Sequence, residues 1–108
     1  MSGYDLIIPV YNEKKILELI EYLLKNTKKI KKIFICYDND NDITLKLIEK
    51  SQYIHLDQII LVKNNFKGPC EAVKTGIEAS KEKAVIVYPA DDFHNGLLLD
   101  EMYKFFEL

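Results

Sequence analysis

The sequence is poor in several residue types that mark particular classes of protein. It holds two cysteines, four glycines, three prolines and no tryptophan among 108 residues. A small secreted domain held together by disulfides needs more cysteines at closer spacing, so that class is excluded. We expect Cys36 and Cys70 to be free thiols in a reducing compartment, which predicts a cytoplasmic location.

Long apolar runs and an excess of positive charge are also missing. No stretch approaches the roughly 18 apolar residues that are typical of a membrane-spanning helix. A longer parent protein that lies at the cytoplasmic face of a membrane is compatible with this pattern. The formal net charge of −2 gives no overall attraction to nucleic acid, so we expect no nucleic-acid partner.

Two familiar phosphate-binding motifs are absent as well. No G-x-G-x-x-G follows the first apolar run, which argues against a dinucleotide-binding dehydrogenase. No P-loop is present, which argues against a P-loop nucleotide hydrolase. Any nucleotide site must therefore use other residues.

What the sequence does contain is a regular series of short, β-branched apolar runs. They are DLIIPVY (5–11), KIFICY (32–37), QIILVK (58–63) and KAVIVY (83–88). Each run is nearly continuous rather than alternating, which is typical of strands buried on both faces of a parallel sheet.

The segments between and after these runs place apolar residues at helical spacing. They predict helices within residues 12–26, 42–51, 68–82 and 95–108, with Asn12 and Asp42 as N-caps of the first two. Strands that alternate with helices indicate βαβ units and an α/β fold. No Pro/Gly/Ser-rich linker divides the chain, so we expect a single domain over residues 1–108.

Polar residues collect directly after each predicted strand, at 11–13, 38–42, 64–68 and 91–94. In open α/β sheets, ligands bind beyond the carboxyl ends of the strands. We therefore expect these four segments to meet at one edge of the sheet and to form a site there.

The last of these segments contains two adjacent acids, Asp91 and Asp92. Neighbouring carboxylates repel each other unless a cation lies between them. Mg²⁺ or Mn²⁺ would resolve the conflict, and such an ion typically keeps one or two protein carboxylates and leaves room for substrate phosphates. The alternative is a helix cap, with Asp92 or Asn95 at the start of the last helix.

The acidic stretch YDNDNDIT (37–44) has three readings. Its first residues resemble a calcium loop, but the glycine and the distal glutamate of that motif are missing. Asp38 could instead accept an N–H group of a nucleobase. Asp40 and Asp42 also suit a polar turn that caps the second helix.

Three stretches, taken in order, resemble family 2 glycosyltransferases. LIIPVYNE (6–13) resembles their opening strand and turn, and KIFICYDNDNDIT (32–44) resembles their acidic nucleotide-binding stretch. NNFKGPCEAVKTGIEASKEKAVIVYPADD (64–92) resembles their segment from a glycine-containing loop to the metal-binding acids. The likeness spans nearly the whole chain and is closest to polyprenyl- or dolichol-phosphate sugar transferases.

The resemblance implies a GT-A fold, whose first half is a Rossmann-like three-layer α/β/α unit with a parallel sheet of strand order 3-2-1-4. It implies a glycosyltransferase domain that binds a nucleotide-diphosphate sugar and, in the intact enzyme, transfers the sugar to a polyprenyl-phosphate or glycan acceptor. The family normally continues into an acceptor site and a catalytic base, so we expect a truncated GT-A domain.

The same resemblance assigns roles to residues near the strand ends. Pro9, Tyr11 and Glu13 would contact the nucleoside, and Asp38 would hold the base with Tyr37 beside it. These five residues come from the ends of the first two predicted strands.

The later motifs are assigned to the diphosphate, the sugar and the metal. Lys67 and Gly68 fall where a loop approaches the diphosphate or sugar, and Asp91 matches the last acid of the D-x-D motif. Asp91 would bind Mg²⁺ or Mn²⁺, with Asp92 as an additional acid. The first acid of the motif is replaced by Pro89, which weakens the match.

A second hypothesis follows from that departure and from the length of the chain. The domain could be a non-catalytic, self-associating α/β module with a degenerate nucleotide site. Without further strands beside it, the fourth strand would be an exposed apolar edge, and such edges tend to pair. We therefore expect a homo-oligomer formed through the fourth strand or the final helix.

Overall fold

The fold is described from a computed structural model of the chain, which describes residues 3–65, 69–82 and 84–107. Four strands form one parallel sheet in the order β3-β2-β1-β4. Their bounds are β1 (Tyr4–Pro9), β2 (Ile30–Tyr37), β3 (Ile59–Lys63) and β4 (Val85–Val87). The predicted α/β class and the strand order 3-2-1-4 are confirmed.

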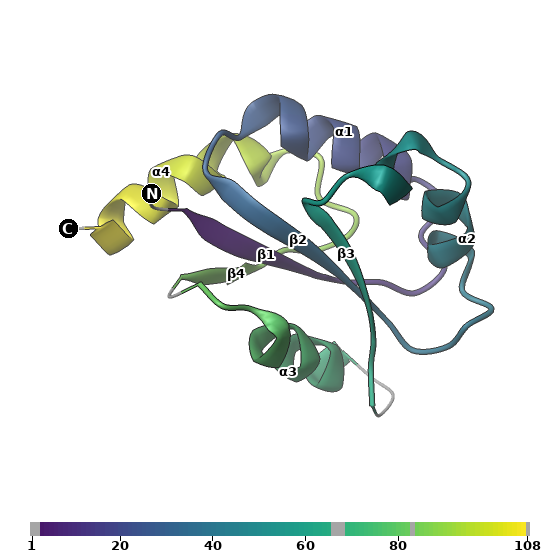
Figure 1. Cartoon of the computed structure of the whole chain (residues 1–108). Coiled ribbons are helices and arrows are strands. Elements are labelled where there is room, and N and C mark those ends of the chain that lie inside the picture. Colours follow the sequence, from purple (N-terminus) through teal and green to yellow (C-terminus); the bar gives the residue numbers. More distant parts are fainter. Residues whose placement is uncertain (1–2, 66–68, 83, 108) are drawn as a thin grey trace.

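Helices cover both faces of this sheet and complete three layers (Figure 1). They are α1 (Ile16–Asn26), α2 (Ile43–Glu49), α3 (Pro69–Ala79) and α4 (Leu99–Glu107). Helices α1, α2 and α4 lie on one face and α3 lies on the other (Figure 1). Two short 3-10 helices, η1 (Gln52–His55) and η2 (Asn95–Leu98), complete the connections.

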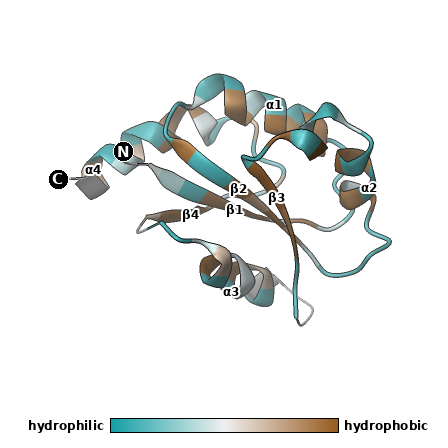
Figure 2. Ribbon diagram, in the orientation of Figure 1, coloured by the Kyte–Doolittle hydropathy of each residue, from teal (hydrophilic) through white to brown (hydrophobic). Residues whose placement is uncertain are grey.

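The strands read as continuous apolar runs because each face of the sheet is buried against a helix. Along β1, Leu6 and Ile8 pack into the core beneath α1, whereas Ile7 belongs to the core beneath α3. All three are fully buried. Figure 2 shows the resulting apolar strands between helices with mixed surfaces. Each such side chain stabilises the fold by about 1.5–3 kcal/mol relative to an exposed one.

Helix α3 lies very close to the sheet because a glycine faces it. A Cβ atom on Gly76 would lie 2.6 Å from Cγ2 of Ile7 in β1, a separation that real side chains do not reach. The small residue therefore sets the distance between α3 and β1.

Helix α4 is fastened to the start of the sheet by Asp100. The hydroxyl of Tyr4 donates to Oδ1 of Asp100 at 2.8 Å, and the backbone N–H of Lys28 donates to Oδ2 at 2.7 Å. The rings of Tyr4 and Tyr103 lie 5.2 Å apart, centroid to centroid. None of the helices within the described ranges is long and apolar enough to cross a bilayer.

The prediction that Asn12 caps the first helix is wrong. β1 ends at Pro9 and α1 begins only at Ile16, where Lys15 holds the N-cap position without a side-chain hydrogen bond. Asn12 has a φ of 50° and its Oδ1 accepts from the backbone N–H of Ile43 in α2. A contact with a different helix therefore took the place of the local cap.

The prediction that Asp42 caps the second helix is confirmed. Its carboxylate accepts from the backbone N–H of Thr44 at 2.7 Å. Cys36 is a buried free thiol, as expected, and burial raises its pKa to about 11. The side chain of Cys70 lies outside the described part of the structure.

Candidate functional site

A cavity of about 450 Å³ opens where β1 and β2 end. Seven of the described residues line it, from the strand ends and from α3: Pro9, Val10, Tyr11, Glu13, Asp38, Asn64 and Ala72. Four of them, Pro9, Tyr11, Glu13 and Asp38, were predicted to contact a nucleoside. The structure therefore brings the predicted residues of the first two strands to one place.

Backbone pairing explains why these residues meet. Pro9 is paired with Cys36 in the parallel register of β1 and β2, and the N–H of Val10 donates to the carbonyl of Cys36 at 2.9 Å. On the other side of β2, the N–H of Asn64 donates to the carbonyl of Tyr37 at 2.8 Å. The segments that follow β1, β2 and β3 thus leave the sheet next to one another.

Asp38 and Asn64 form a polar pair inside the cavity. The amide Nδ2 of Asn64 donates to Oδ1 of Asp38 at 2.8 Å. A carboxylate only accepts hydrogen bonds when ionised, so this contact determines which end of the amide faces Asp38. Asn64 is only 7 % exposed, and its Oδ1 has no hydrogen-bond partner among the described residues.

Asn64 had no predicted role, although it lies in one of the four polar segments. The available signal was its place directly after the third apolar run, since the next residue after a parallel strand lies at the ligand-binding edge. Its pairing with Asp38 spans 26 residues of sequence. No local pattern reveals such a contact.

Tyr37 does not line this cavity. Successive strand residues point to opposite faces of a sheet, and Tyr37 packs against the core on the α1 and α2 face. Asp38, the next residue, faces the cavity instead. Lys67 and Gly68, predicted to approach the diphosphate or sugar, lie outside the described residues.

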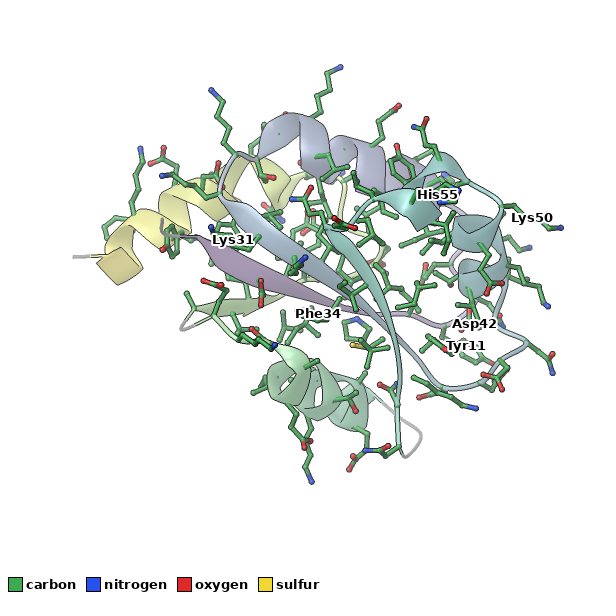
Figure 3. All side chains as sticks on the ribbon, in the orientation of Figure 1. Tyr11, Lys31, Phe34, Asp42, Lys50 and His55 are labelled. Atoms are coloured by element: carbon green, nitrogen blue, oxygen red, sulfur yellow. The ribbon has the colours of Figure 1, made fainter. Side chains whose placement is uncertain are left out.

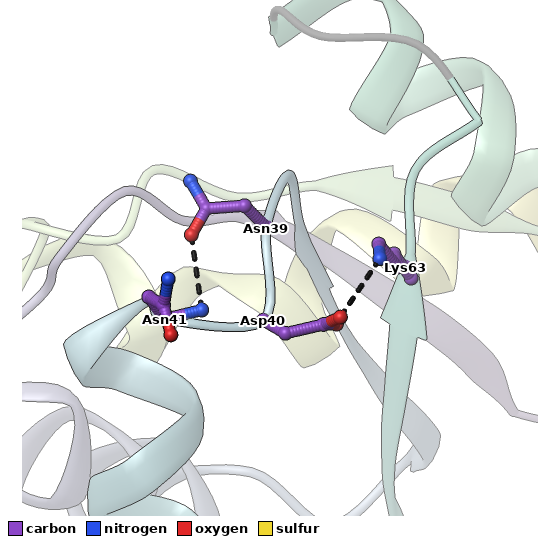
Figure 4. Close-up of polar contacts among 4 residues, drawn as sticks. All are labelled: Asn39, Asp40, Asn41 and Lys63. Atoms are coloured by element: carbon purple, nitrogen blue, oxygen red, sulfur yellow. Dashed lines mark hydrogen bonds and ion pairs between the residues drawn. The ribbon is translucent and has the colours of Figure 1, made fainter.

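The acids of the stretch after β2 have three different sets of partners. Asp38 lines the cavity and Asp42 caps α2. Asp40 is exposed and forms an ion pair with Lys63 at 3.0 Å, while Asn39 accepts from the N–H of Asn41 at 3.0 Å (Figure 4). These acids therefore do not converge on a common point, which argues against a calcium-binding loop.

Tyr11 lies at the rim of the cavity with 69 % of its surface exposed. Figure 3 places it beside Asp42, at the end of the molecule where β1 and β2 terminate. An exposed aromatic ring at the mouth of a cavity offers a flat surface for stacking against a ligand ring.

Glu13 carries the clearest electrostatic signature of the site. Its pKa is raised above the ordinary value, first by burial and then by the negative charges of Asp91 and Asp42. β4 runs parallel to β1, so the loop that contains Asp91 leaves the sheet at the same edge as the segments that contain Tyr11 and Asp38. Asp91 is not among the described residues that line the cavity.

Asp92 is engaged in its own turn. Its carboxylate accepts from the backbone N–H of His94 and of Asn95, both at 2.8 Å, and from Nδ2 of Asn95 at 2.7 Å. Those bonds hold its pKa at about 2. These bonds close a turn just before η2, whose N-cap position is held by His94 without a side-chain hydrogen bond. Neither Asp92 nor Asn95 holds the N-cap position of η2 that the sequence offered as an alternative, and Asp91 is the exposed acid of the pair.

The described residues supply few metal ligands. Nowhere in residues 3–65, 69–82 and 84–107 do three His, Cys, Asp or Glu side chains come together in a way that could hold an ion. A cation at Asp91 would therefore depend on oxygen atoms from its substrate. Mg²⁺ sites that combine one or two carboxylates with phosphates have this character.

Comparison with known proteins assigns the chain to a family. The family model described as Glycosyl transferase family 2 matches residues 5–108. S. aureus TarS 1–349 in complex with UDP is similar, with a TM-score of 0.76 and 24% identity over 97% of this chain and 32% of that chain. The UDP-GlcNAc complex of the same protein matches with the same score and identity, over 31% of that chain.

A further TarS structure matches with a TM-score of 0.74 and 20% identity, over 97% of this chain and 19% of that chain. At these identities the likeness shows a shared fold. The chain spans about a third of the TarS 1–349 structures that it matches.

The hydrogen bonds that Asp92 accepts in its turn predict a pH-dependent contribution to stability. Because the pKa of Asp92 is lowered from 3.8 to about 2, its stabilisation is complete above the unfolded value and is lost as the pH falls toward 2. Asp92→Ala should therefore have a lower thermal unfolding midpoint than wild type at pH 7, and the two midpoints should converge near pH 2. Asp91→Ala is the control and should show no such loss. A difference that persists unchanged at pH 2 would contradict the assignment.

Proposed function

The chain belongs to glycosyl transferase family 2, and from that premise we propose that its cavity binds the nucleoside of a nucleotide-diphosphate sugar. The observation that carries the proposal is the meeting of Pro9, Tyr11, Glu13 and Asp38 around one cavity. TarS structures contain UDP and UDP-GlcNAc, which supports a UDP-sugar as the donor for this chain.

The polar pair in the cavity suits recognition of a base with a ring N–H. Asp38 offers a carboxylate oxygen as an acceptor, and the amide of Asn64 holds this carboxylate in place. Uracil carries one ring N–H between two carbonyl groups, so its N–H would donate to Asp38. Tyr11 would stack on the base, a contact worth about 1–3 kcal/mol for nucleobases on aromatic side chains.

The diphosphate would extend from the nucleoside toward Asp91. Asp91 would hold Mg²⁺ or Mn²⁺ together with the phosphate oxygens, because it is exposed in the loop after β4, which leaves the sheet at the same edge as the loop after β1. Such an ion supplies positive charge that stabilises the departing diphosphate. Asp92 contributes less to this proposal, since its oxygens already accept three hydrogen bonds.

The acceptor is proposed to be a polyprenyl phosphate or a glycan, in an enzyme that works at the cytoplasmic side of a membrane. The sequence resemblance to polyprenyl- and dolichol-phosphate sugar transferases supports the first of these acceptors. The described cavity is assigned to the donor alone.

Asp38→Asn should weaken binding of UDP by roughly 10- to 150-fold. This is the range expected when a hydrogen bond to a charged group, worth about 1.5–3 kcal/mol, is lost. It is lost because the single amide oxygen of the asparagine would accept from Asn64 and leave an NH₂ group facing the base. Isothermal titration calorimetry with UDP measures the change. Asp40→Asn is the matched control, because Asp40 lies two residues away in an exposed ion pair. Equal affinities for Asp38→Asn and wild type, or an equal loss in both variants, would count against the assignment.

Mn²⁺ should strengthen UDP binding by the wild type, and Asp91→Asn should abolish that gain. Binding of uridine, which has no phosphate, should be unaffected by the same substitution. Asp92→Asn should keep the response to Mn²⁺, because an asparagine still offers an oxygen to the turn that Asp92 caps. A full Mn²⁺ response in Asp91→Asn would move the cation site elsewhere.

A second candidate function is a non-catalytic, self-associating module, and exposed apolar surface favours it. β4 lies at the edge of the sheet and Val87 is exposed. Four further exposed apolar side chains follow on η2 and α4: Leu97, Leu98, Met102 and Phe105. Open strand edges and apolar patches are typical association surfaces. We propose that a homo-oligomer forms through this surface.

Met102→Lys should lower the average molar mass measured by multi-angle light scattering at a fixed protein concentration. A charge in the centre of the apolar surface on α4 disfavours its burial against another copy. Ile77→Lys is the matched control, because Ile77 is 53 % exposed on α3, as Met102 is on α4. A wild type that remains monomeric as its concentration rises would refute the oligomer.

A further inference from the structure

Four hydrogen bonds join the loop between β1 and α1 to the beginning of α2. In each of them a backbone N–H donates to a side-chain oxygen. The N–H of Asn12 donates to both oxygens of Asp42, at 3.1 and 3.2 Å. The N–H of Glu13 donates to Oγ1 of Thr44 at 2.7 Å. In return, the N–H of Ile43 donates to Oδ1 of Asn12 at 2.9 Å. We call the acceptors Asp42 and Thr44 the loop anchor.

The loop anchor is buried, whereas the loop that it holds is exposed. Asp42 is 2 % exposed and Thr44 is fully buried. Hydrogen bonds to a charged or buried acceptor contribute more than those at the surface, because an unpaired partner would lack compensation from water. Neither residue lines the cavity, but their hydrogen-bond partners are next to or part of its lining.

The backbone of the loop also needs this support. Asn12 has a φ of 50°, in the left-handed region that few residues other than glycine adopt. Such a conformation persists where the surrounding contacts determine it. Here those contacts are the hydrogen bonds that Asn12 donates to Asp42 and accepts from Ile43. The turn at Asn12 in turn separates Tyr11 from Glu13, the two loop side chains that line the cavity.

We propose that Asp42 and Thr44 are positioning residues of the nucleotide site, which hold Tyr11 and Glu13 in the arrangement that meets the ligand. The inference rests on the proposed nucleotide-binding function. A loop that is already ordered binds with a smaller entropic cost than a loop that must be ordered on binding. The acidic stretch would then act twice: Asp38 contacts the base directly, and Asp42 acts through the neighbouring loop.

Thr44 allows a test with a closely matched pair of variants. Thr44→Val keeps the branched shape but removes the hydroxyl that accepts from Glu13, whereas Thr44→Ser keeps the hydroxyl. UDP affinity should fall roughly 3- to 10-fold in Thr44→Val, as expected for the loss of one hydrogen bond, and should stay within about twofold in Thr44→Ser. Thermal unfolding of each variant establishes that it is folded at the temperature of the titration.

A second measurement separates positioning from a general loss of stability. The pKa of the Glu13 carboxyl group can be followed by carbon-13 NMR without any ligand. It is raised in the wild type by burial and by the charges of Asp91 and Asp42. Displacement of the loop should move it back toward the ordinary value in Thr44→Val and leave it raised in Thr44→Ser.

The outcomes distinguish this inference from the function on which it rests. A wild type that binds no UDP overturns the proposed function, and the inference falls with it. A wild type that binds UDP, with equal affinity and an equally raised Glu13 pKa in both Thr44 variants, overturns the inference alone. Should Thr44→Val fail to fold, Asp42→Asn replaces it: the asparagine keeps one side-chain oxygen for the N–H of Thr44 but loses one of the two oxygens that accept from Asn12, and a loss of affinity is again expected.

Discussion

The parallel pairing of β1 with β2 is the constraint on which the rest of the site depends. Two strands that run the same way end at the same edge, so the segments that follow them must share space. The bond from Val10 to the carbonyl of Cys36 marks the last point of this pairing. Beyond it, one chain turns into the loop with Tyr11 and Glu13, while the other continues into Asp38 and then α2. The cavity is the space between these two departures.

Acids that are neighbours in the sequence make different contacts, because the backbone directs their side chains to different surroundings. Asp38, Asp40 and Asp42 alternate in sequence, yet one lines the cavity, one pairs with a surface lysine and one anchors a loop from another part of the chain. Asp91 and Asp92 divide in the same way between the edge of the site and a turn. A count of carboxylates therefore overstates the number that can meet a ligand.

The residues of the proposed donor site come from two kinds of element. A rigid sheet supplies Asp38 at its edge, and a loop held by buried hydrogen bonds supplies Tyr11 and Glu13. The donor site thus combines a fixed acceptor with an ordered but exposed aromatic ring. The exposed apolar side chains of β4, η2 and α4 are not among the described residues that line the cavity.

Sequence alone determined the order of strands and helices, because apolar periodicity and local caps such as that of Asp42 are short-range properties. It also placed Tyr11, Glu13 and Asp38 at one edge, since each ends or closely follows a predicted strand, whereas Pro9 was assigned through the family resemblance. Tertiary structure decided the rest. Asn12 accepts a hydrogen bond from α2 and does not cap α1, and Asn64 donates to Asp38. Tyr37 packs against the core, and the negative charge of Asp91 contributes to the raised pKa of Glu13. Apart from the position of Tyr37, which follows the alternation of side chains along β2, these outcomes join residues that are far apart in the chain. Their partners are set by the packing of the whole sheet, and no local pattern of residues contains that information.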